Sequence, residues 1–438
     1  MVFRLLNRFR SAPSVTRAPA RQPLDLAGLL GRPPINLDTP ELQRFLAGKR
    51  VLVTGAGGSI GSEICRQTMR FCPERLVLLE RAENALFEID RELRHTWVGA
   101  DVRPCIGDVC DAARVRQVFE AERPQVVFHC AAHKHVPMME AHPCEAIKNN
   151  VFGTKTVADA CLDAGVAAFV LVSTDKAVNP TSVMGATKRV AELYVQSLNE
   201  ATRGRGDAET RRRRTDVTVA SFSSLPASPR LRVPASSSCR FLAVRFGNVL
   251  GSSGSVVPIF QKQIEAGGPV TVTHPEMKRY FMMIPEASQL VMQAGAIGRG
   301  GEIFVLDMGE QVRIVDLATA LIRRNGLRPN DDIEIRFTGI RPGEKLYEEL
   351  ANDDEQTGAT AHEKIRVWKL PPADPREVAR GLELLSDAAA TGNSVEAIAA
   401  LARCVPEYQP AIELPKRGDA IDAEQPVLRL TSPEVEAA

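Results

Sequence analysis

The stretch VLVTGAGGSIGSEICRQ, residues 51–67, decides the fold class of this chain. An apolar run of strand length leads into the glycines Gly55, Gly58 and Gly61, and a helical pattern follows at once. Such a turn lets the backbone approach a pyrophosphate, while the N–H groups at the start of the helix face the negative charge. The stretch therefore predicts a dinucleotide site, in which Ser59 and Ile60 are further expected contacts.

Apolar runs of strand length recur along the first half of the chain. The first five alternate with helical patterns, and short buried strands that alternate with helices predict a parallel sheet covered on both faces. We therefore expect an α/β fold with a doubly wound parallel Rossmann sheet and a smaller C-terminal substrate-binding lobe. The predicted strands are 50–54, 75–79, 102–106, 125–130, 167–173 and 242–246.

Changes in composition along the chain indicate its domain organisation. The regular alternation of strands and helices ends near residue 250, and both ends of the chain lack it. We expect a basic tail and lead-in segment over 1–47, a dinucleotide-binding Rossmann domain over 48–250, a substrate-binding lobe over 251–410 and a disordered tail over 411–438.

Two segments depart from this division. Residues 302–308 are apolar and are predicted to form a strand that returns to the Rossmann sheet. Residues 202–239 are rich in Arg, Ser and Pro and have no sustained apolar period, which predicts a disordered insertion. Its arginines Arg211–Arg214 either touch phosphates or lie in a solvated loop.

The composition argues against several classes of protein. A net charge of +1 over 438 residues gives no reason to expect a nucleic-acid partner. No run of about 18 apolar residues is present, so no transmembrane segment is expected. The nine cysteines are scattered, which favours thiols in a reducing compartment. We expect a cytoplasmic protein.

The N-terminal stretch of residues 1–23 is rich in arginine and holds no acidic residue. It fits a disordered basic tail. Because Leu5, Leu6 and Phe9 stand near helical spacing, it also fits a weak peripheral membrane contact, and its composition is compatible with organelle targeting. The sequence leaves these alternatives open.

The end of the predicted second strand bears on the choice of cofactor. Glu80 stands there, where a carboxylate accepts hydrogen bonds from the ribose hydroxyls of adenosine. Its charge would repel a 2′-phosphate, which favours NAD over NADP, although the adjacent Arg81 could pair with such a phosphate. After the third strand, Asp108, with Val109 beside it, either meets the adenine amino group or caps the next helix.

Six motifs occur in order along the chain: TGAGGSIG (54–61), HCAAHKHVPMME (129–140), NNVFGT (149–154), STDKAVNPTSVMGATK (173–188), RFGNVLGSSGSVVP (245–258) and GIRPGEKLYEEL (339–350). Together they resemble the polysaccharide-biosynthesis branch of the extended short-chain dehydrogenases/reductases. Members with this pattern are UDP-N-acetylglucosamine 4,6-dehydratases. The resemblance runs from about residue 26 to residue 410, apart from the insertion, and corresponds to the soluble core that follows a membrane region in many relatives.

The resemblance implies a defined reaction. A 4,6-dehydratase oxidises the C4 hydroxyl of the sugar by hydride transfer to the cofactor, removes the C5 proton, loses water from C6 and returns the hydride to C6. The product is a 4-keto-6-deoxy sugar nucleotide for surface polysaccharide or protein glycosylation. This chemistry needs proton acceptors at C4 and C5 and an acid at the C6 hydroxyl.

The resemblance also assigns catalytic residues. Lys188 fits the lysine that binds the nicotinamide ribose, and Met184 stands four residues earlier, where most of the superfamily has a tyrosine. The dehydratase branch that looks closest also has methionine there. Acid–base work is then expected from Thr174 at the C4 oxygen, Asp175 as the acid for water loss and Lys176 as the base at C5. The proton acceptor at C4 is left open, with Asp175 acting twice or a water molecule as alternatives.

Further contacts are expected around the dinucleotide and the substrate. Ala131 and Ala132 are small enough to let the chain pass the cofactor, Lys134 could reach cofactor or sugar, and Asn150 is expected to support the cofactor site and its helix. His133 and His135 lack suitably spaced partners, so no metal site is expected. The expected substrate contacts are Lys134, His135, Asn248, Ser252, Ser255, Val256, the diphosphate candidates Arg279 and Arg341, and Glu344 at the uridine ribose.

We therefore predict an NAD-dependent 4,6-dehydratase of a UDP-N-acetylhexosamine, UDP-N-acetylglucosamine, acting as a homo-oligomer. One alternative is a sugar-nucleotide 4-epimerase or a C5-inverting dehydratase. Met184 disfavours both, because such relatives generally keep the tyrosine. Another alternative is a non-catalytic dinucleotide-binding scaffold, which would explain Met184 but not the presence of Thr174, Asp175 and Lys176 together.

Overall fold

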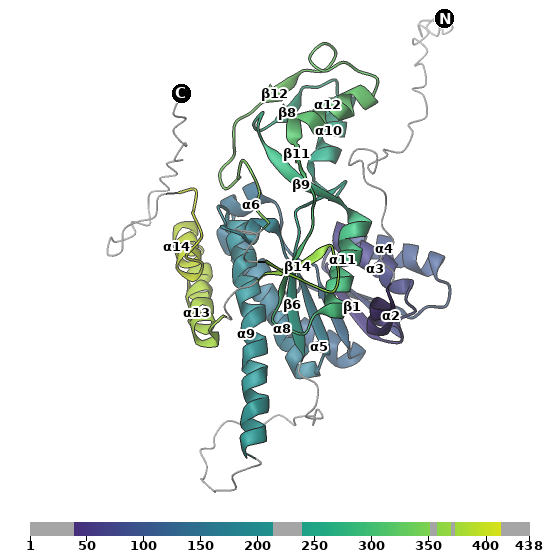
Figure 1. Ribbon diagram of the computed structural model, residues 1–438, viewed down its shortest axis with the longest axis vertical. Coiled ribbons are helices and arrows are strands. Elements are labelled where there is room, and N and C mark those ends of the chain that lie inside the picture. The colour runs from purple at the N-terminus through teal and green to yellow at the C-terminus, as the bar shows by residue number, and fades with distance from the viewer. Residues whose placement is uncertain (1–38, 213–238, 351–356, 369–372, 413–438) are drawn as a thin grey trace, which may run out of the picture.

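The computed structural model describes residues 39–212, 239–350, 357–368 and 373–412. These residues form a Rossmann domain around one large sheet and a smaller lobe at one end of that sheet (Figure 1). The predicted α/β class is confirmed.

A nine-stranded sheet forms the core of the Rossmann domain, in the order β13-β14-β10-β6-β5-β4-β1-β2-β3. The strands from β3 to β10 pair in parallel, and β14 and β13 add antiparallel at one edge. Each strand predicted for this sheet lies within two residues of an observed one. The strands are β1 (Arg50–Thr54), β2 (Arg75–Glu80), β3 (Val102–Ile106), β4 (Val126–His129), β5 (Ala168–Val172), β6 (Arg240–Arg245), β10 (Ile303–Leu306), β13 (Thr357–Ala359) and β14 (Ile365–Trp368).

Helices cover both faces of the sheet, because successive side chains of a strand point to opposite faces. Along β1, Leu52 belongs to one apolar core, while Val51 and Val53 belong to the other. The first face carries α5 (Ala112–Glu122), α8 (Gly153–Ala164), α9 (Val183–Arg212), α13 (Pro375–Thr391) and α14 (Ser394–Cys404); the second carries α2 (Pro40–Leu46), α3 (Ser59–Met69), α4 (Glu83–Thr96) and α11 (Ile284–Ile297).

Short helical segments connect these elements near the carboxyl ends of the strands. They are α6 (Val136–Ala141), α7 (Pro143–Ala146), the π-helix η1 (Ile147–Phe152) and the 3₁₀ turn η2 (Asp175–Ala177). π-Helical turns and 3₁₀ turns are often found at functional sites and as connectors. Both η1 and η2 carry residues that the sequence singles out, Asn150 and Asp175.

The smaller lobe has an apolar core of its own. It contains α10 (Val256–Glu265), α12 (Ile314–Arg324), a sheet of β7 (Asn248–Leu250), β9 (Lys278–Met283) and β11 (Gln311–Arg313), and the pair β8 (Val270–Val272) and β12 (Ile335–Phe337). Since β7 follows β6 after two residues, the lobe begins at the carboxyl end of the Rossmann sheet.

The C-terminal helices α13 and α14 differ from the expectation that residues up to 410 belong to the lobe. Their side chains Leu385 and Leu401 share an apolar core with Phe169 of β5. Both helices lie along α9 (Figure 1). An amphipathic helix pattern shows which face is buried, but it does not show which partner buries that face.

Helix α9 differs from the expectation of a structureless insertion that starts at residue 202, because it continues to Arg212. The arginine, glutamate and alanine residues there have good helix propensity, which outweighs the missing apolar period. Residues 213–238 and the predicted tails over 1–38 and 413–438 lie outside the described residues. Within the described ranges, no helix is both long and apolar enough to span a bilayer.

Candidate active site

Two adjoining cavities lie at the carboxyl ends of β1, β4 and β5, where the strand order reverses. Open α/β sheets bind their ligands at such a point. The smaller cavity, of about 330 Å³, extends toward the end of β2. The larger, of about 910 Å³, lies between the Rossmann domain and the lobe. Both are lined by Gly55 and Gly58, so the glycine turn joins them.

Most residues predicted from the sequence line one of these cavities. Asp175 and Asn150 are buried and are not among the described residues that line either cavity. The smaller cavity is lined by Gly55, Gly58, Glu80, Arg81, Asp108, Val109, Ala131 and Ala132. The larger is lined by Gly55, Gly58, Ser59, Ile60, Gly61, Ala132, Lys134, His135, Thr174, Lys176, Met184, Lys188, Asn248, Ser252, Ser255, Val256, Arg279, Arg341 and Glu344.

The glycine turn tolerates no side chain at its two ends. Gly55 has a φ of +64°, and a Cβ there would lie 2.7 Å from the backbone nitrogen of Ala131. A Cβ at Gly61 would overlap the carbonyl oxygen of Gly55. The turn therefore packs directly against the chain that leaves β4, and α3 starts close behind it.

Glu80 holds the glycine turn from the end of β2. Its carboxylate accepts the Gly57 N–H at 3.1 Å and the Ala82 N–H at 2.9 Å. Beside it, Arg81 pairs with Asp108 at 3.6 Å. The alternative that Asp108 caps the next helix is wrong, because the α5 cap is Asp111, whose side chain accepts the Arg114 N–H.

Lys188 and Met184 lie one turn apart on α9 and line the larger cavity. Burial lowers the pKa of Lys188 to about 8, against Glu192 and Cys130, which raise it. Lys188 therefore stands close to its titration point near neutral pH. Met184 offers no titratable group to this cavity.

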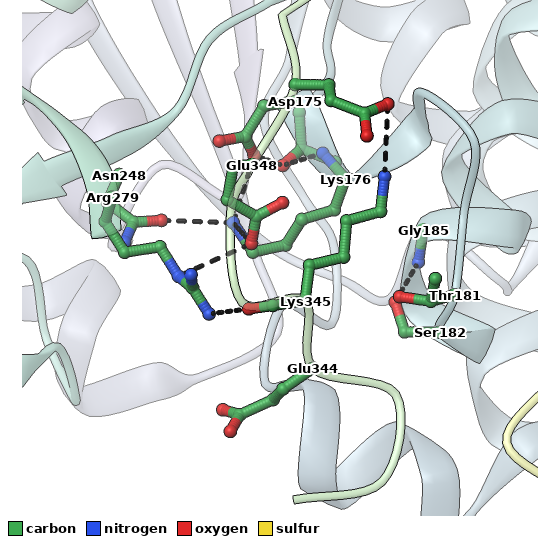
Figure 2. A network of polar contacts seen from close by, with 12 residues as sticks. Asp175, Lys176, Thr181, Ser182, Gly185, Asn248, Arg279, Glu344, Lys345 and Glu348 are labelled. Atoms are coloured by element: carbon green, nitrogen blue, oxygen red, sulfur yellow. Dashed lines mark hydrogen bonds and ion pairs between the residues drawn. The ribbon is translucent and has the colours of Figure 1, made fainter. Parts of the chain in front are cut away.

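Lys176 lies at the centre of a polar cluster that joins the Rossmann domain to the lobe (Figure 2). Its Nζ lies 3.0 Å from Oδ1 of Asp175, 3.1 Å from Oδ1 of Asn248 and 3.3 Å from Oε1 of Glu348. Thr174 donates its hydroxyl to the same Oδ1 of Asp175 at 2.9 Å. The predicted trio of Thr174, Asp175 and Lys176 is thus brought together at the end of β5.

Asn150 lies behind the cavities instead of lining them. Its Oδ1 accepts the His133 N–H at 2.8 Å, and its Nδ2 donates to the His133 carbonyl at 3.0 Å and to the Thr187 hydroxyl at 3.1 Å. Asn150 therefore fixes the loop after β4 against α9. These contacts agree with the expected support of the helix. They do not support a direct contact between the Asn150 side chain and a cofactor.

The loop before α10 brings the lobe to the glycine turn. The Ser59 hydroxyl accepts the Ser253 N–H at 3.1 Å, and Lys134 Nζ donates to the Ser252 hydroxyl at 3.3 Å. The Ser255 hydroxyl is buried without a hydrogen-bond partner among the described residues. Because Ser255 also lines the larger cavity, its hydroxyl is available to a ligand.

Arg279 differs from the expected diphosphate clamp. It is buried, and its guanidinium donates to the carbonyls of Lys278, Leu346 and Lys345 and pairs with Glu348 at 3.4 Å. These contacts occupy the guanidinium with protein groups, so it holds the segment after residue 341 in place. This role could not be predicted from the sequence, because the local pattern around an arginine does not show whether its partner is a protein group or a phosphate.

Arg341 and Glu344 line the larger cavity and pair with each other at 2.5 Å. Arg341 is more than half exposed. Their expected contacts with the diphosphate and the uridine ribose stay predictions. The segment is anchored nearby, since Thr181 donates to the Gly343 carbonyl at 3.1 Å.

Glu348 is the site residue that sequence reasoning missed. It lines the larger cavity, is only 3% exposed and touches both Lys176 and Arg279. The sequence shows two adjacent glutamates, Glu348 and Glu349, and nothing in the local pattern says which is buried. Only the position of the lobe relative to η2 decides it.

Comparisons with known proteins give the family of this chain. A family model described as polysaccharide biosynthesis protein matches residues 51–370. The chain belongs to this family. It is 51% identical over 348 residues to the capsular polysaccharide biosynthesis protein CapD of Staphylococcus aureus, covering 79% of this chain and 52% of that protein. The chain thus spans about half the length of this polysaccharide-biosynthesis relative.

Two shorter relatives are named for reactions on sugar nucleotides. A UDP-N-acetylglucosamine 4,6-dehydratase (inverting) of Campylobacter jejuni is 32% identical over 311 residues, covering 70% of this chain and 79% of that protein. A UDP-glucose 4-epimerase of Rickettsia canadensis is also 32% identical, over 334 residues, covering 75% of this chain and 84% of that protein. Identity alone therefore does not separate the two reactions.

Proposed function

We propose that this polysaccharide-biosynthesis protein is an NAD-dependent 4,6-dehydratase of UDP-N-acetylglucosamine. The observation that carries the proposal is the cluster of Thr174, Asp175 and Lys176, of which Thr174 and Lys176 line the larger cavity with Met184, while the buried Asp175 contacts both of them. Oxidation at C4 alone needs one proton acceptor, usually the tyrosine in whose place Met184 stands. Dehydration also needs an acid at C6 and a base at C5. A cluster of a carboxyl and an amine fits that need.

The smaller cavity suits the adenosine part of NAD, and the nicotinamide part would extend past the glycine turn into the larger cavity. A Cβ at Gly55 or Gly61 would collide with backbone, so glycine at these positions allows the tight turn that brings the start of α3 toward a pyrophosphate. Residues 55–61 would hold the pyrophosphate, Glu80 the adenosine ribose and Lys188 the nicotinamide ribose. NAD, when bound, supplies the hydride acceptor and donor.

The surroundings of Glu80 support NAD over NADP. The carboxylate accepts two backbone N–H groups, and a 2′-phosphate on the adenosine ribose would meet its negative charge. Arg81, the residue that could compensate, is already paired with Asp108. These two neighbouring contacts support the proposed preference for NAD.

The residues of the chain would divide the proton transfers. Thr174 holds Asp175 by a hydrogen bond and would meet the C4 oxygen. Asp175 is proposed to act twice: it takes the proton of the C4 hydroxyl during hydride transfer and gives it to the C6 hydroxyl as water leaves. Lys176 is the proposed base at C5. The ketone at C4 acidifies the C5 proton, which lets an amine remove it.

The substrate class rests on the family and on the lobe. The Ser255 hydroxyl and the N-terminal end of α10 lie at the larger cavity and suit the anionic diphosphate of a sugar nucleotide. The name of the Campylobacter jejuni relative supports UDP-N-acetylglucosamine, and the capsular relative supports a role in surface polysaccharide synthesis. Protein glycosylation is the other use of such a product.

An epimerase is the second candidate, and one experiment separates it. Purified protein is incubated with NAD and UDP-N-acetylglucosamine, and the product is read by mass spectrometry and NMR. Loss of one water supports the dehydratase, and NMR then gives the configuration at C5. An unchanged mass with a new C4 epimer supports the epimerase. Retained NAD binding without turnover of the sugar supports a scaffold and contradicts both.

A further inference from the structure

The contacts of Lys176 raise a difficulty for a base at C5. An ammonium has three N–H donors, and three oxygen atoms surround Nζ, from Asp175, Asn248 and Glu348. Burial lowers the pKa of Lys176, but Asp175 and Glu348 outweigh it and the pKa is raised. The resting side chain is therefore the ammonium. It has to lose a proton before it can accept one.

Two carboxyl groups lie close enough to receive that proton. Asp175 is wholly buried, also accepts the Thr174 hydroxyl, and is not among the described residues that line the larger cavity. Glu348 is 3% exposed and does line the cavity. Its Oε2 has no hydrogen-bond partner among the described residues. A protonated Glu348 could thus keep its hydrogen bond to Lys176 or direct its hydroxyl into the cavity.

The charges around Glu348 fit an exchange of a proton. Lys176 and Asp175 face it from η2, and Arg279 faces it from β9. Burial raises the pKa of Glu348, against Lys176 and Arg279, which lower it. Moving a proton from Lys176 to Glu348 replaces two buried charges by two neutral groups. Because buried charges carry a desolvation penalty, burial lowers the free energy needed for this proton transfer.

We infer that Glu348 is a third acid–base group of this site, which stores the proton of Lys176 while Lys176 acts as the base at C5. The inference rests on the proposed dehydratase function. One N–H bond of the ammonium breaks and an O–H bond forms on Oε1 of Glu348. The neutral amine then takes the C5 proton, and the electron pair of the C5–H bond stays on the sugar, conjugated with the C4 carbonyl.

The stored proton returns in the same way. After water has left, Lys176 gives its proton back to C5, and Glu348 gives its proton back to Nζ. The site ends with an ammonium and a carboxylate, as it began. No reactant besides the substrate is needed for this exchange.

The test compares Glu348→Gln and Glu348→Asp with the wild type in the water-loss assay. The amide keeps the shape of the side chain but cannot take a proton, so kcat is expected to fall by about 100-fold or more. KM and the NAD dissociation constant are expected to stay within about threefold. Glu348→Asp is expected to recover part of the activity. Glu310→Gln, the same change at an exposed glutamate of the lobe, is expected to match the wild type.

A pH profile separates acid–base work from a structural role. Protonated Glu348 cannot accept a proton, so the wild-type kcat is expected to fall on the acid side, above the usual range of a glutamate, and Glu348→Gln is expected to lack that limb. An unchanged kcat in Glu348→Gln overturns the inference, as does a change in KM or in thermal stability alone. A wild type that releases no water contradicts the proposed function instead, whatever Glu348 does.

Discussion

Arg245 and Glu192 form a wholly buried ion pair behind the candidate site, with Nε of Arg245 2.7 Å from Oε1 of Glu192. The same Oε1 accepts the Ser173 hydroxyl at 2.7 Å, and the guanidinium lies over the Trp368 ring, 3.8 Å from its centroid. The pair joins α9 to β5, β6 and β14. Since Ser173 directly precedes Thr174, this network fixes the backbone from which the cluster of Thr174, Asp175 and Lys176 starts.

Replacing Arg245 by methionine is expected to destabilise the protein by about 3–5 kcal/mol, because the buried Glu192 loses its bidentate partner and keeps only the longer contact with Arg189, at 3.4 Å. The free energy of unfolding is measured by urea titration. Arg313→Met is the matched control, since Arg313 pairs with Asp316 on the surface and such pairs contribute about 0–1 kcal/mol. An equal loss of unfolding free energy in both variants would show that the buried pair stabilises the protein no more than the surface pair does.

Asp175→Asn is expected to abolish water loss while the cofactor still binds. The amide keeps the hydrogen bond from Thr174 but cannot supply a proton, and general acid catalysis is worth about 10²–10⁴-fold in rate. Product mass gives the activity and a fluorescence titration gives NAD binding. Asp163→Asn, on the exposed side of α8, is the control. Full activity in Asp175→Asn would contradict the assignment of the acid.

Gly55→Ala, compared with Gly99→Ala, separates the role of the glycine turn in NAD binding from the effect of backbone strain. Gly55 and Gly99 both have positive φ, +64° and +86°, which costs about 1–2 kcal/mol for alanine. Only at Gly55 does a Cβ meet backbone, at 2.7 Å from the Ala131 nitrogen. We expect Gly99→Ala to lose stability but to bind NAD normally, and Gly55→Ala to lose NAD binding as well. Equal NAD affinity in the two variants would contradict the role of the turn.

Glu80→Ala tests the choice of cofactor. It removes the ribose acceptor and the bonds to the Gly57 and Ala82 N–H groups. A hydrogen bond to a charged group is worth about 1.5–3 kcal/mol, so NAD affinity is expected to fall about 10–100-fold. NADP affinity is expected to fall less or to rise. A titration with both dinucleotides checks this, and a parallel loss of both affinities would contradict discrimination by Glu80.

Much of the fold could be predicted because its signals are local. The apolar runs predicted both ends of β1 and of β3 correctly. The glycine turn could be predicted from the spacing of its glycines alone. Contacts between segments far apart in the sequence leave weaker signals. Helices α13 and α14 show an apolar face, but only tertiary packing assigns that face to the Rossmann core.

The same division holds for the candidate site. Thr174, Asp175 and Lys176 are neighbours in sequence, so their cluster could be expected. The partners that set their chemistry come from far along the chain: Asn248 is 72 residues from Lys176, and Glu348 follows the insertion and the whole lobe. Asp108 failed as a cap because Asp111, three residues later, takes that position. Which of two such close acidic residues caps the helix cannot be decided until the first residue of α5 is known.

The pH dependence of cofactor binding tests Lys188. Burial lowers its pKa to about 8, so its ammonium is complete below that pH and is lost as the pH rises through it, whereas an ordinary lysine keeps its charge to about 10. If the ammonium holds the nicotinamide ribose, NAD affinity is expected to decrease from pH 7 to pH 9. Lys188→Arg keeps its charge throughout and is expected to flatten this profile, and Lys188→Met to bind weakly at every pH. A wild-type affinity that is constant over this range, or a decrease that persists in Lys188→Arg, would remove Lys188 from the cofactor site.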